Sequence, residues 1–458
     1  MGLNIGPRMT GLINFIQKIN ADIGIELPAG WQKLPEIEIA QNFLRGVNGF
    51  FFQTYSNIGT TKFDEEEFQY FSEFHKFWEK HHQEILNPRI NRVQARQAAE
   101  CLSKAVKRYG NDILLVTHKT HGVSKAAIAQ VRFFTANQDF REPPKDPYGA
   151  YLKDSARFDA IEVYKDPEGF LKFIGATRLS QSDKRFDFAR NAAKFLSDNG
   201  ITAFQIAERF KNDVETIREA LINFPNMGYG MKKSHMFIRD MVELKVWPTI
   251  ANYDKIDVPS DINTMKLALR TRILETDIPL LSSFLDIFGH QYGCIEEMSA
   301  SAWRVVWEEW RGVDAVTAPS SPCELDFLLY RIGREYCKPN LVEYECENGH
   351  SFFYFGAQVS LCRICKKKGM RGEAIPKRRM LPCQVNAKEL PREEGILMLK
   401  EQNLLRTFDG VCILEQTCQP KTDLFRILDP PKSISIKGQT SWTNSTADRE
   451  RGGGGMMG

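Results

Sequence analysis

Apolar side chains recur every three or four positions through most of the segment from residue 186 to residue 335. That period places them on one face of an α-helix, whereas a half-buried strand would alternate apolar and polar residues. The same period returns in the apolar and aromatic residues of 36–105. The sequence therefore predicts a chain that is mainly α-helical.

The segment from 110 to 180 departs from this period. Two short apolar runs, residues 158–164 and 170–179, flank the sequence Asp166-Pro167-Glu168-Gly169. Asp, Pro and Gly are typical turn residues, and two short runs joined by such a turn are typical of paired strands. We therefore expect a β-hairpin at this point of an otherwise helical chain.

Composition excludes several classes of protein. With 42% hydrophobic and 26% charged residues, the 458-residue chain is not disordered as a whole, and it has room for about two to four domains. No apolar run approaches the roughly 18–20 residues that cross a bilayer, and the N-terminus lacks the pattern of a secretory signal. These features predict a cytoplasmic protein with no membrane partner, and no protein partner is evident. The 61 basic and 58 acidic residues leave a net charge of +3, which does not decide whether the chain binds nucleic acid.

The cysteines point to a metal site. Ten cysteines are too few for a disulfide scaffold in a chain of this length, and most of them lie in its last third. Cys346-x3-His350 is followed, after eleven residues, by Cys362-x2-Cys365. Two closely spaced pairs of ligands are typical of a tetrahedral zinc site, and four protein ligands make such a site structural rather than catalytic. We predict a zinc ribbon that holds a structural Zn²⁺.

Alternatives to this ligand set remain. The thiols could be reduced and without metal, and Cys337 or Cys383 could take the place of His350. The metal motif overlaps a basic run, residues 363–379, which carries eight basic residues and one acidic residue, Glu373. A solvated linker is one interpretation of such a run, but beside a zinc module we favour contact with phosphate groups.

The stretch from Val214 to Leu274 carries the most specific pattern. A predicted helix ends at the link Phe224-Pro225-Asn226-Met227-Gly228-Tyr229-Gly230, and a second helix begins directly after it. Pro and two glycines allow a tight turn whose backbone amides, together with the positive end of the helix dipole, can bind a phosphate group. An ordinary link between two helices is the alternative.

Two lysines stand at the start of that second helix. Lys232 and Lys233 lie where the helix dipole disfavours cations, and such local conflicts tend to mark functional sites. Lys233 shares a helix face with Phe237, while Lys232 lies about 100° around the helix. Farther along, Val258-Pro259-Ser260-Asp261 precedes another predicted helix, so Asp261 is expected to cap that helix, to present a carboxylate to Lys233, or to do both.

In these features the sequence resembles the helix–hairpin–helix DNA glycosylases. The run from Lys233 to Phe237 is most similar to the archaeal 8-oxoguanine glycosylase branch, with its Lys-Thr-x-x-Phe pattern. The stretch from Ser321 to Tyr330 is similar to the Pro-x-x-Leu-Asp-x-Leu-Leu-Trp helix of that branch. The resemblance covers residues 195–335 well and residues 36–105 loosely. It implies a two-lobed helical core. It does not account for the β-containing insertion at 110–180 or for the C-terminal zinc ribbon after residue 335, which are expected as additions to that core.

The resemblance also implies an activity. The matching lysine attacks the anomeric carbon of a flipped nucleotide, and the matching aspartate stabilises the positive charge that develops, which assigns Lys233 and Asp261 as the catalytic pair. An amine nucleophile also allows a subsequent lyase step through a Schiff base. The further residues implied are Phe237, Asp326, Tyr330 and Gln53 in the base pocket, and Asn226, Gly228, Gly230 and Lys232 at the DNA backbone.

Departures from the family pattern affect the expected substrate. Asn226 stands where the family usually has Gly, Tyr330 replaces Trp, and the segment before the hairpin is long. The expected partner is DNA containing a modified base, either 8-oxoguanine or a hypermodified phage base such as glucosylated hydroxymethylcytosine, since some similar bacterial glycosylases act in phage defence. The alternative is a non-catalytic DNA-binding protein that uses the hairpin, the zinc ribbon and the basic run.

This interpretation divides the chain into seven parts. They are an N-terminal extension (1–35), the N-terminal helical part of the core (36–109), an insertion with the β-hairpin (110–185), the helix–hairpin–helix catalytic core (186–335), the zinc-ribbon module (336–385), a C-terminal segment (386–429) and a disordered tail (430–458).

Overall fold

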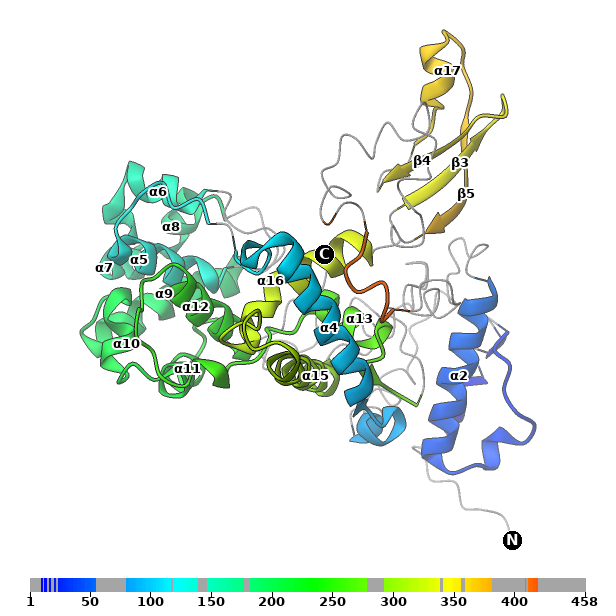
Figure 1. Ribbon diagram of the computed structural model, residues 1–458, viewed down its shortest axis with the longest axis horizontal. Coiled ribbons are helices and arrows are strands. Elements are labelled where there is room, and N and C mark those ends of the chain that lie inside the picture. The colour runs from blue at the N-terminus through cyan, green and yellow to red at the C-terminus, as the bar shows by residue number, and fades with distance from the viewer. Residues whose placement is uncertain are drawn as a thin grey trace. The chain divides into compact units, whose positions relative to one another are not determined.

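The protein is known from a computed structural model and divides into two compact units. Unit 1 comprises residues 1–110, 261–315 and 329–445, and unit 2 comprises residues 111–260, 316–328 and 446–458. Helices make up most of the described residues in both units (Figure 1), which confirms the prediction of a mainly α-helical chain. The residues that the structure describes are 10, 12–14, 16, 17, 20, 21, 24–54, 80–116, 118–138, 146–176, 182–277, 292–337, 341–355, 359–380, 408 and 411–418.

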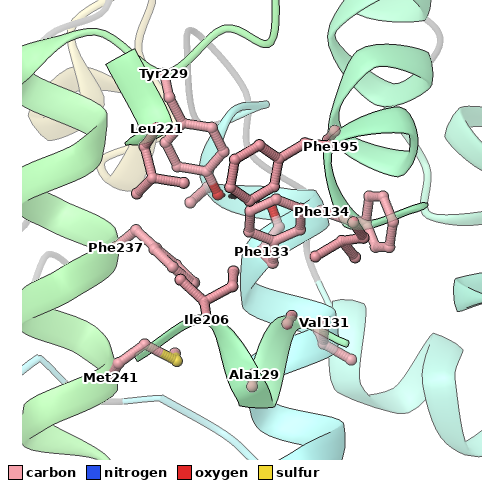
Figure 2. Close-up of a cluster of buried hydrophobic side chains, with 14 of the residues drawn as sticks. Ala129, Val131, Phe133, Phe134, Phe195, Ile206, Leu221, Tyr229, Phe237 and Met241 are labelled. Carbon is pink, nitrogen blue, oxygen red and sulfur yellow. Dashed lines mark hydrogen bonds between the residues drawn. The ribbon is translucent and has the colours of Figure 1, made fainter. Parts of the chain in front are cut away.

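Unit 2 is built from short helices around one hydrophobic core. Rings from three different segments meet there, with Phe133, Tyr229 and Phe237 separated by 5.6–5.7 Å between centroids (Figure 2). Its elements are α5 (Lys125–Ala136), α6 (Pro147–Lys153), α7 (Ala160–Lys165), α8 (Pro167–Phe173), α9 (Ser182–Asn199), α10 (Ile206–Arg209), α11 (Val214–Asn223) and α12 (Met231–Glu243), with 3₁₀ turns η2 (Asn111–Ile113), η3 (Ser155–Phe158), η4 (Ala203–Gln205), η5 (Tyr253–Lys255) and η7 (Pro322–Leu325).

The β-hairpin predicted within 110–180 is wrong, because its two apolar runs form the helices α7 and α8. Asp166 does not begin a β-turn. Its side chain caps α8 by accepting a hydrogen bond from the Gly169 amide at 2.8 Å, and Pro167 occupies the first helical position. Proline suits that position because its missing N–H would have no partner in the helix. A turn signal and a helix-start signal use the same residues, and here the helix forms.

The two helices also belong to the core that carries the hairpin. The fully buried side chains of Val163, Phe170 and Leu171 pack in the same hydrophobic cluster as Phe237 and Met241 of α12. Helices α7 and α8 both pack on α9. The segment interpreted as an insertion therefore shares its hydrophobic core with the helix that bears Lys233.

Unit 1 contains a group of longer helices. Helix α15 packs along α4 and against α13, and its Trp303 and Trp310 are fully buried. The Trp303 indole donates to the main-chain oxygen of Thr264 at 3.2 Å, which fixes α15 to the first turn of α13. The elements are η1 (Trp31–Lys33), α2 (Glu36–Thr54), α4 (Arg92–Tyr109), α13 (Ile262–Arg270), α15 (Tyr292–Val313) and α16 (Asp326–Tyr336), with a two-stranded sheet of β1 (Arg89–Ile90) and β2 (Leu274–Glu275). The first residues of α16 belong to unit 2.

Unit 1 also contains a small antiparallel sheet. Its strands are β3 (Leu341–Cys346), β4 (Ser351–Phe355) and β5 (Ala374–Met380), in the order β4-β3-β5, and the short helix α17 (Arg363–Lys367) lies beyond one end of the strands (Figure 1). Tyr344 and Phe352 stack across β3 and β4 at 5.4 Å and contribute to a small core of its own. This is the region predicted to be a zinc ribbon.

Among the helices that the structure describes, none combines the length and the apolar character needed to cross a bilayer. The predicted disordered tail, 430–458, lies outside the described residues, and so does Cys383.

Candidate functional site

The link between α11 and α12, residues 224–230, is a tight turn that depends on one glycine. Asn226 (φ 52°) and Gly228 (φ 77°) both adopt the left-handed backbone conformation. A Cβ atom at Gly228 would lie 2.6 Å from the ring of Phe188, which is far inside van der Waals contact. By contrast, a Cβ at Gly230 would meet nothing within 4 Å. Only Gly228 is thus required by both its φ angle and its close approach to a neighbour.

Hydrogen bonds connect this hairpin to neighbouring segments. The Asn137 side-chain amide donates to the Met227 carbonyl at 3.1 Å, and the Asn191 amide donates to the Asn226 carbonyl at 3.1 Å. The buried Tyr229 side chain donates from its hydroxyl to the Phe133 carbonyl at 2.6 Å. These bonds fix the turn against α5 and α9.

Several amides of the hairpin remain available. Within the described part of the chain, the backbone N–H groups of Asn226, Gly228 and Gly230 donate to no acceptor. Asn226 and Gly230 are exposed. Amides in this position, just before the N-terminus of α12, can bind an anion such as phosphate.

Lys232 and Lys233 follow directly in the first turn of α12, as predicted from the sequence. The first turn contains no acidic residue. The half-buried Lys233 places its Nζ 2.7 Å from the main-chain oxygen of Asn137 and 5.4 Å from the centre of the Phe188 ring. These two contacts orient the amine beside the hairpin.

Asn137 is a residue of this site that the sequence did not reveal. It is fully buried at the end of α5, and its side-chain amide also donates to the Phe188 carbonyl at 3.2 Å. One residue therefore holds the hairpin through its side chain and Lys233 through its backbone. The only local signal was an Asn at the end of a helical pattern, where it is a common residue, so no pattern in the sequence could have singled it out.

Asp261 caps α13 as predicted. Its Oδ1 accepts from the amides of Asn263 at 2.8 Å and Thr264 at 2.9 Å. The hydroxyl of Thr264 returns a capping bond by accepting from the Asp261 amide at 2.7 Å. Oδ2 makes no bond to the helix backbone and accepts from the Asn263 side chain at 3.1 Å. Capping thus occupies one oxygen of this half-buried carboxylate. Asp261 belongs to unit 1, whereas Lys233 belongs to unit 2.

The residues expected in the base pocket have different surroundings. Phe237 is fully buried, with Phe133, Tyr229 and Trp247 around it, so its ring presents no open face on which a base could stack. Tyr330 is half-buried on α16, and its hydroxyl accepts a hydrogen bond from Arg334. Gln53 lies in α2 at a position whose side chain is outside the described part.

Asp326 belongs to a cluster of buried charges on and around α12. Its carboxylate pairs with Arg239, which also binds Asp240 at 2.8 Å, while Arg132 of α5 binds the other oxygen of Asp240 at 2.5 Å. Burial alone would raise the pKa of Asp240, but Arg132 and Arg239 outweigh it and hold the pKa well below its ordinary value. The pairing gives Asp326 a role in joining the start of α16 to α12.

Glu243 lies at the edge of this cluster and behaves differently. Burial raises the pKa of its carboxyl to about 7, although Arg239 opposes the shift. Its Oε2 accepts a hydrogen bond from the Val116 amide at 3.3 Å. A carboxyl group with a pKa raised to about 7 thus lies nearly three turns beyond Lys233 on the same helix.

The predicted metal ligands come together at the end of the small sheet. Cys346 ends β3, His350 precedes β4, and Cys362 and Cys365 lie at the start of α17. Their ligand atoms lie within 4.8 Å of one another, so the four side chains could hold a metal ion. The Sγ atoms of Cys346 and Cys365 are 3.7 Å apart, and His350 Nδ1 lies 3.3–4.0 Å from the three sulfur atoms.

These separations suit a tetrahedral ion. With Zn–S bonds of about 2.3 Å and a Zn–N bond of about 2.0–2.1 Å, sulfur ligands lie about 3.8 Å apart and a sulfur and a nitrogen ligand about 3.6 Å apart. Burial raises the pKa of the Cys346 thiol, but hydrogen bonds from the backbone amides of His350 and Asn348 outweigh burial and lower the pKa to about 7. The lowered pKa favours the thiolate, which is the form that binds metals. The alternative ligand Cys337 is not among the four clustered residues, and its main-chain oxygen accepts from Arg270 at 2.6 Å.

Comparison with models of known protein families and with curated protein sequences found no match to this chain.

Proposed function

We propose that this protein is a DNA N-glycosylase that removes a modified base with Lys233 as nucleophile and Asp261 as the essential carboxylate. The observation that carries the proposal is the position of Lys233. It lies in the first turn of α12, directly after a hairpin whose amides are open to a phosphate, with its Nζ held by the Asn137 carbonyl. The resemblance to helix–hairpin–helix glycosylases assigns the same two residues.

The chemistry follows from an amine at that position. The target nucleotide leaves the base stack, since a stacked base cannot be reached. The Nζ lone pair attacks C1′, the N-glycosidic bond breaks, and the base departs with the bonding electrons and takes up a proton. Oδ2 of Asp261, the oxygen not used in capping, stabilises the positive charge that develops at the sugar. The C1′–O4′ bond of this adduct then breaks, O4′ takes up a proton, and C1′ becomes a Schiff base with Nζ. Loss of a C2′ proton from the Schiff base allows elimination of the 3′ phosphate, which would add lyase activity.

Two substrates fit this proposal: 8-oxoguanine and a hypermodified phage base such as glucosylated hydroxymethylcytosine, the latter in a defence role. The deviations at Tyr330 and Asn226 favour a base other than 8-oxoguanine. In addition, the Phe237 ring is fully buried in the core, and the Asp326 carboxylate is paired with Arg239. Recognition of the base must therefore rest on other side chains. Structural Zn²⁺ would occupy the Cys346, His350, Cys362 and Cys365 cluster, because these ligands fill a tetrahedron and leave no open position for substrate.

The test is borohydride trapping of the Schiff base. Duplexes carrying 8-oxoguanine, an alkylated base, uracil or glucosylated hydroxymethylcytosine are incubated with the wild type and with Lys233→Ala, Asp261→Asn and Lys232→Ala. We expect a covalent adduct with one of these bases, its absence in Lys233→Ala, and a reduction of at least 100-fold in rate for Asp261→Asn. Lys232→Ala is the matched control and should still form the adduct.

The second candidate is a DNA-binding protein without catalysis. It is favoured by the ion pair that occupies Asp326 and by the full burial of Phe237. Binding of every duplex in the panel without any adduct, at equal affinity for the wild type and Lys233→Ala, would establish this alternative and overturn the glycosylase.

A further inference from the structure

The loop after the second pair of metal ligands concentrates positive charge. Lys366, Lys367, Lys368 and Arg371 are all exposed and lie within six residues. Among the described residues, none of these four side chains is within ion-pair distance of a carboxylate. Lys377 on β5, in the same module, differs from them because it pairs with Glu345 at 2.7 Å.

The metal ligands fix the backbone of this loop. The amides of Lys368 and Met370 both donate to the main-chain oxygen of Cys365 at 2.9 Å. At the other end, the Gly372 carbonyl accepts from the Cys362 amide at 2.9 Å. The loop is therefore closed at both ends on residues that also supply metal ligands.

A bridge between the two pairs of ligands adds to this constraint. The Asn348 side-chain amide, which lies between Cys346 and His350 in the sequence, donates to Cys365 Sγ at 3.2 Å and to the Arg371 carbonyl at 3.3 Å. A Cβ at Gly372 would lie 2.9 Å from both Asn348 Nδ2 and Cys365 Sγ. The backbone at residue 372 therefore lies so close to these side chains that a larger residue would clash with them. Loss of the metal should thus release the loop and its charges together.

Apolar side chains accompany the cations. Met370 lies within the loop and is 45% exposed, and Leu361 and Ile375, on either side of it in the sequence, are 44% and 49% exposed. Lys368 also lies beside a metal ligand, with its Nζ 3.4 Å from His350 Nε2. Cations that pair with no carboxylate among the described residues, together with a few apolar side chains, fit a polyanion that also presents apolar groups. Duplex DNA has both, because its phosphates alternate with sugars, and each strand carries one phosphate per about 3.4 Å of helix axis.

We propose that Lys366, Lys367, Lys368 and Arg371 form a metal-dependent contact for the phosphate backbone of duplex DNA, independent of base sequence. The choice of DNA as the polyanion rests on the proposed glycosylase function. Phosphate contacts of this kind position a protein on the duplex without reading its bases. This loop would supply part of the affinity of the protein for the duplex.

The experiment measures binding of the full-length protein to an unmodified duplex by fluorescence anisotropy at several salt concentrations. The test variant replaces Lys366, Lys367, Lys368 and Arg371 with Gln. The matched control replaces four exposed lysines on other elements, Lys107, Lys153, Lys165 and Lys172, and so removes the same net charge. A charge-retaining variant, K366R/K367R/K368R/R371K, checks that the loop tolerates substitution.

We expect the Gln variant to bind at least tenfold more weakly at low salt. The slope of log K against log salt should fall by up to about 3.6, since each lost phosphate contact removes about 0.9. The control and charge-retaining variants should bind as the wild type does. Removal of the metal by a chelator should weaken the wild type to the level of the Gln variant and leave that variant unchanged.

Equal slopes for the Gln variant and the control would overturn the proposal, as would binding that is unaffected by the chelator. The outcome is separate from that of the glycosylase because the duplex is unmodified and its binding involves no covalent step. If the loop variant loses affinity while no base yields a covalent adduct, the DNA contact stands and the catalytic proposal falls. If adducts form and the slope is unchanged, the reverse holds.

Discussion

The amine of Lys233 donates to the main-chain oxygen of Asn137 at 2.7 Å, across 96 positions of sequence. The Asn137 side chain donates at the same time to Met227 in the hairpin and to Phe188 in α9. One buried residue thus sets both the position of the proposed nucleophile and the position of the turn that precedes it.

Replacing Asn137 with Ala should impair the proposed chemistry more than the affinity for DNA. The buried Met227 carbonyl loses its side-chain donor, at a cost of about 1–3 kcal/mol. The main-chain oxygen that binds Lys233 remains in the variant, but residue 137 is no longer tied to the hairpin and to Phe188, so the amine is held less firmly in place. We expect a lower melting temperature and a borohydride-trapping rate that falls at least tenfold, with unmodified-duplex affinity changed by less than threefold.

Asn191→Ala provides the control for this prediction. Asn191 also donates to a hairpin carbonyl, that of Asn226, at 3.1 Å, but at an exposed site where water can replace it. Its effect on stability should stay below about 1 kcal/mol. An equal effect of the two substitutions on trapping would show that Asn137 does not position Lys233.

Gly228→Ala and Gly230→Ala should separate the two glycines of the hairpin. The Ala side chain at 228 would meet Phe188 at 2.6 Å and would impose a positive φ on a residue with a Cβ, whereas position 230 is open and has φ −100°. We expect a loss of about 2–4 kcal/mol for Gly228→Ala and less than about 1 kcal/mol for Gly230→Ala. Urea unfolding checks both values, and similar losses would contradict the strained geometry of the turn.

Signals that are local in the sequence predicted much of this site. The spacing of Cys346, His350, Cys362 and Cys365 predicted their assembly, because short-spaced ligand pairs need only a tight turn each to meet. The Val-Pro-Ser-Asp261 pattern likewise predicted a helix cap, which depends on residues no more than three positions apart.

Relationships between distant residues could not be predicted in this way. The bond from Lys233 to Asn137 and the ion pair of Arg239 with Asp326, 87 positions apart, depend on how whole helices pack. The helices α7 and α8 were missed for a different reason. Asp166-Pro167 is equally compatible with a β-turn and with a helix start, and the burial of Phe170 and Leu171 in the shared core stabilises the helical form.

Glu243 should make stability depend on pH near neutrality. Burial raises the pKa of its carboxyl in the folded state from its ordinary value of 4.5 to about 7. The folded state therefore binds this proton more tightly than the unfolded state does. The resulting stability is fully present below pH 4.5 and is lost as the pH rises through about 7, by up to about 3 kcal/mol.

Glu243→Gln should remove this dependence, because an amide cannot ionise. We expect the free energy of unfolding of the wild type to fall more steeply than that of the variant between pH 5 and 8, as measured by urea unfolding. Glu162→Gln, at an exposed position on α7, is the control and should follow the wild type. Asp240 does not confound this window, since its lowered pKa affects stability only in acid. Parallel wild-type and Glu243→Gln curves would contradict the raised pKa.

Metal removal should unfold the small sheet and leave α12 intact. The cluster of buried residues around Tyr344 and Phe352 is small and includes all three cysteine ligands, so we expect it to depend on the ion to exclude water. We expect a chelator, or Cys362→Ser, to abolish amide-exchange protection in β3, β4 and β5 and to eliminate bound zinc. Exchange in α12, which packs in the separate core of unit 2, should not change.

Three further variants test which residues bind the ion. Cys337→Ser alters a buried thiol that is not among the clustered ligands and should keep one bound zinc per chain. His350→Cys should also retain the metal, because a fourth thiolate completes the same tetrahedron. Loss of zinc from Cys337→Ser with retention in His350→Ala would exclude His350 as the fourth ligand and assign that role to Cys337.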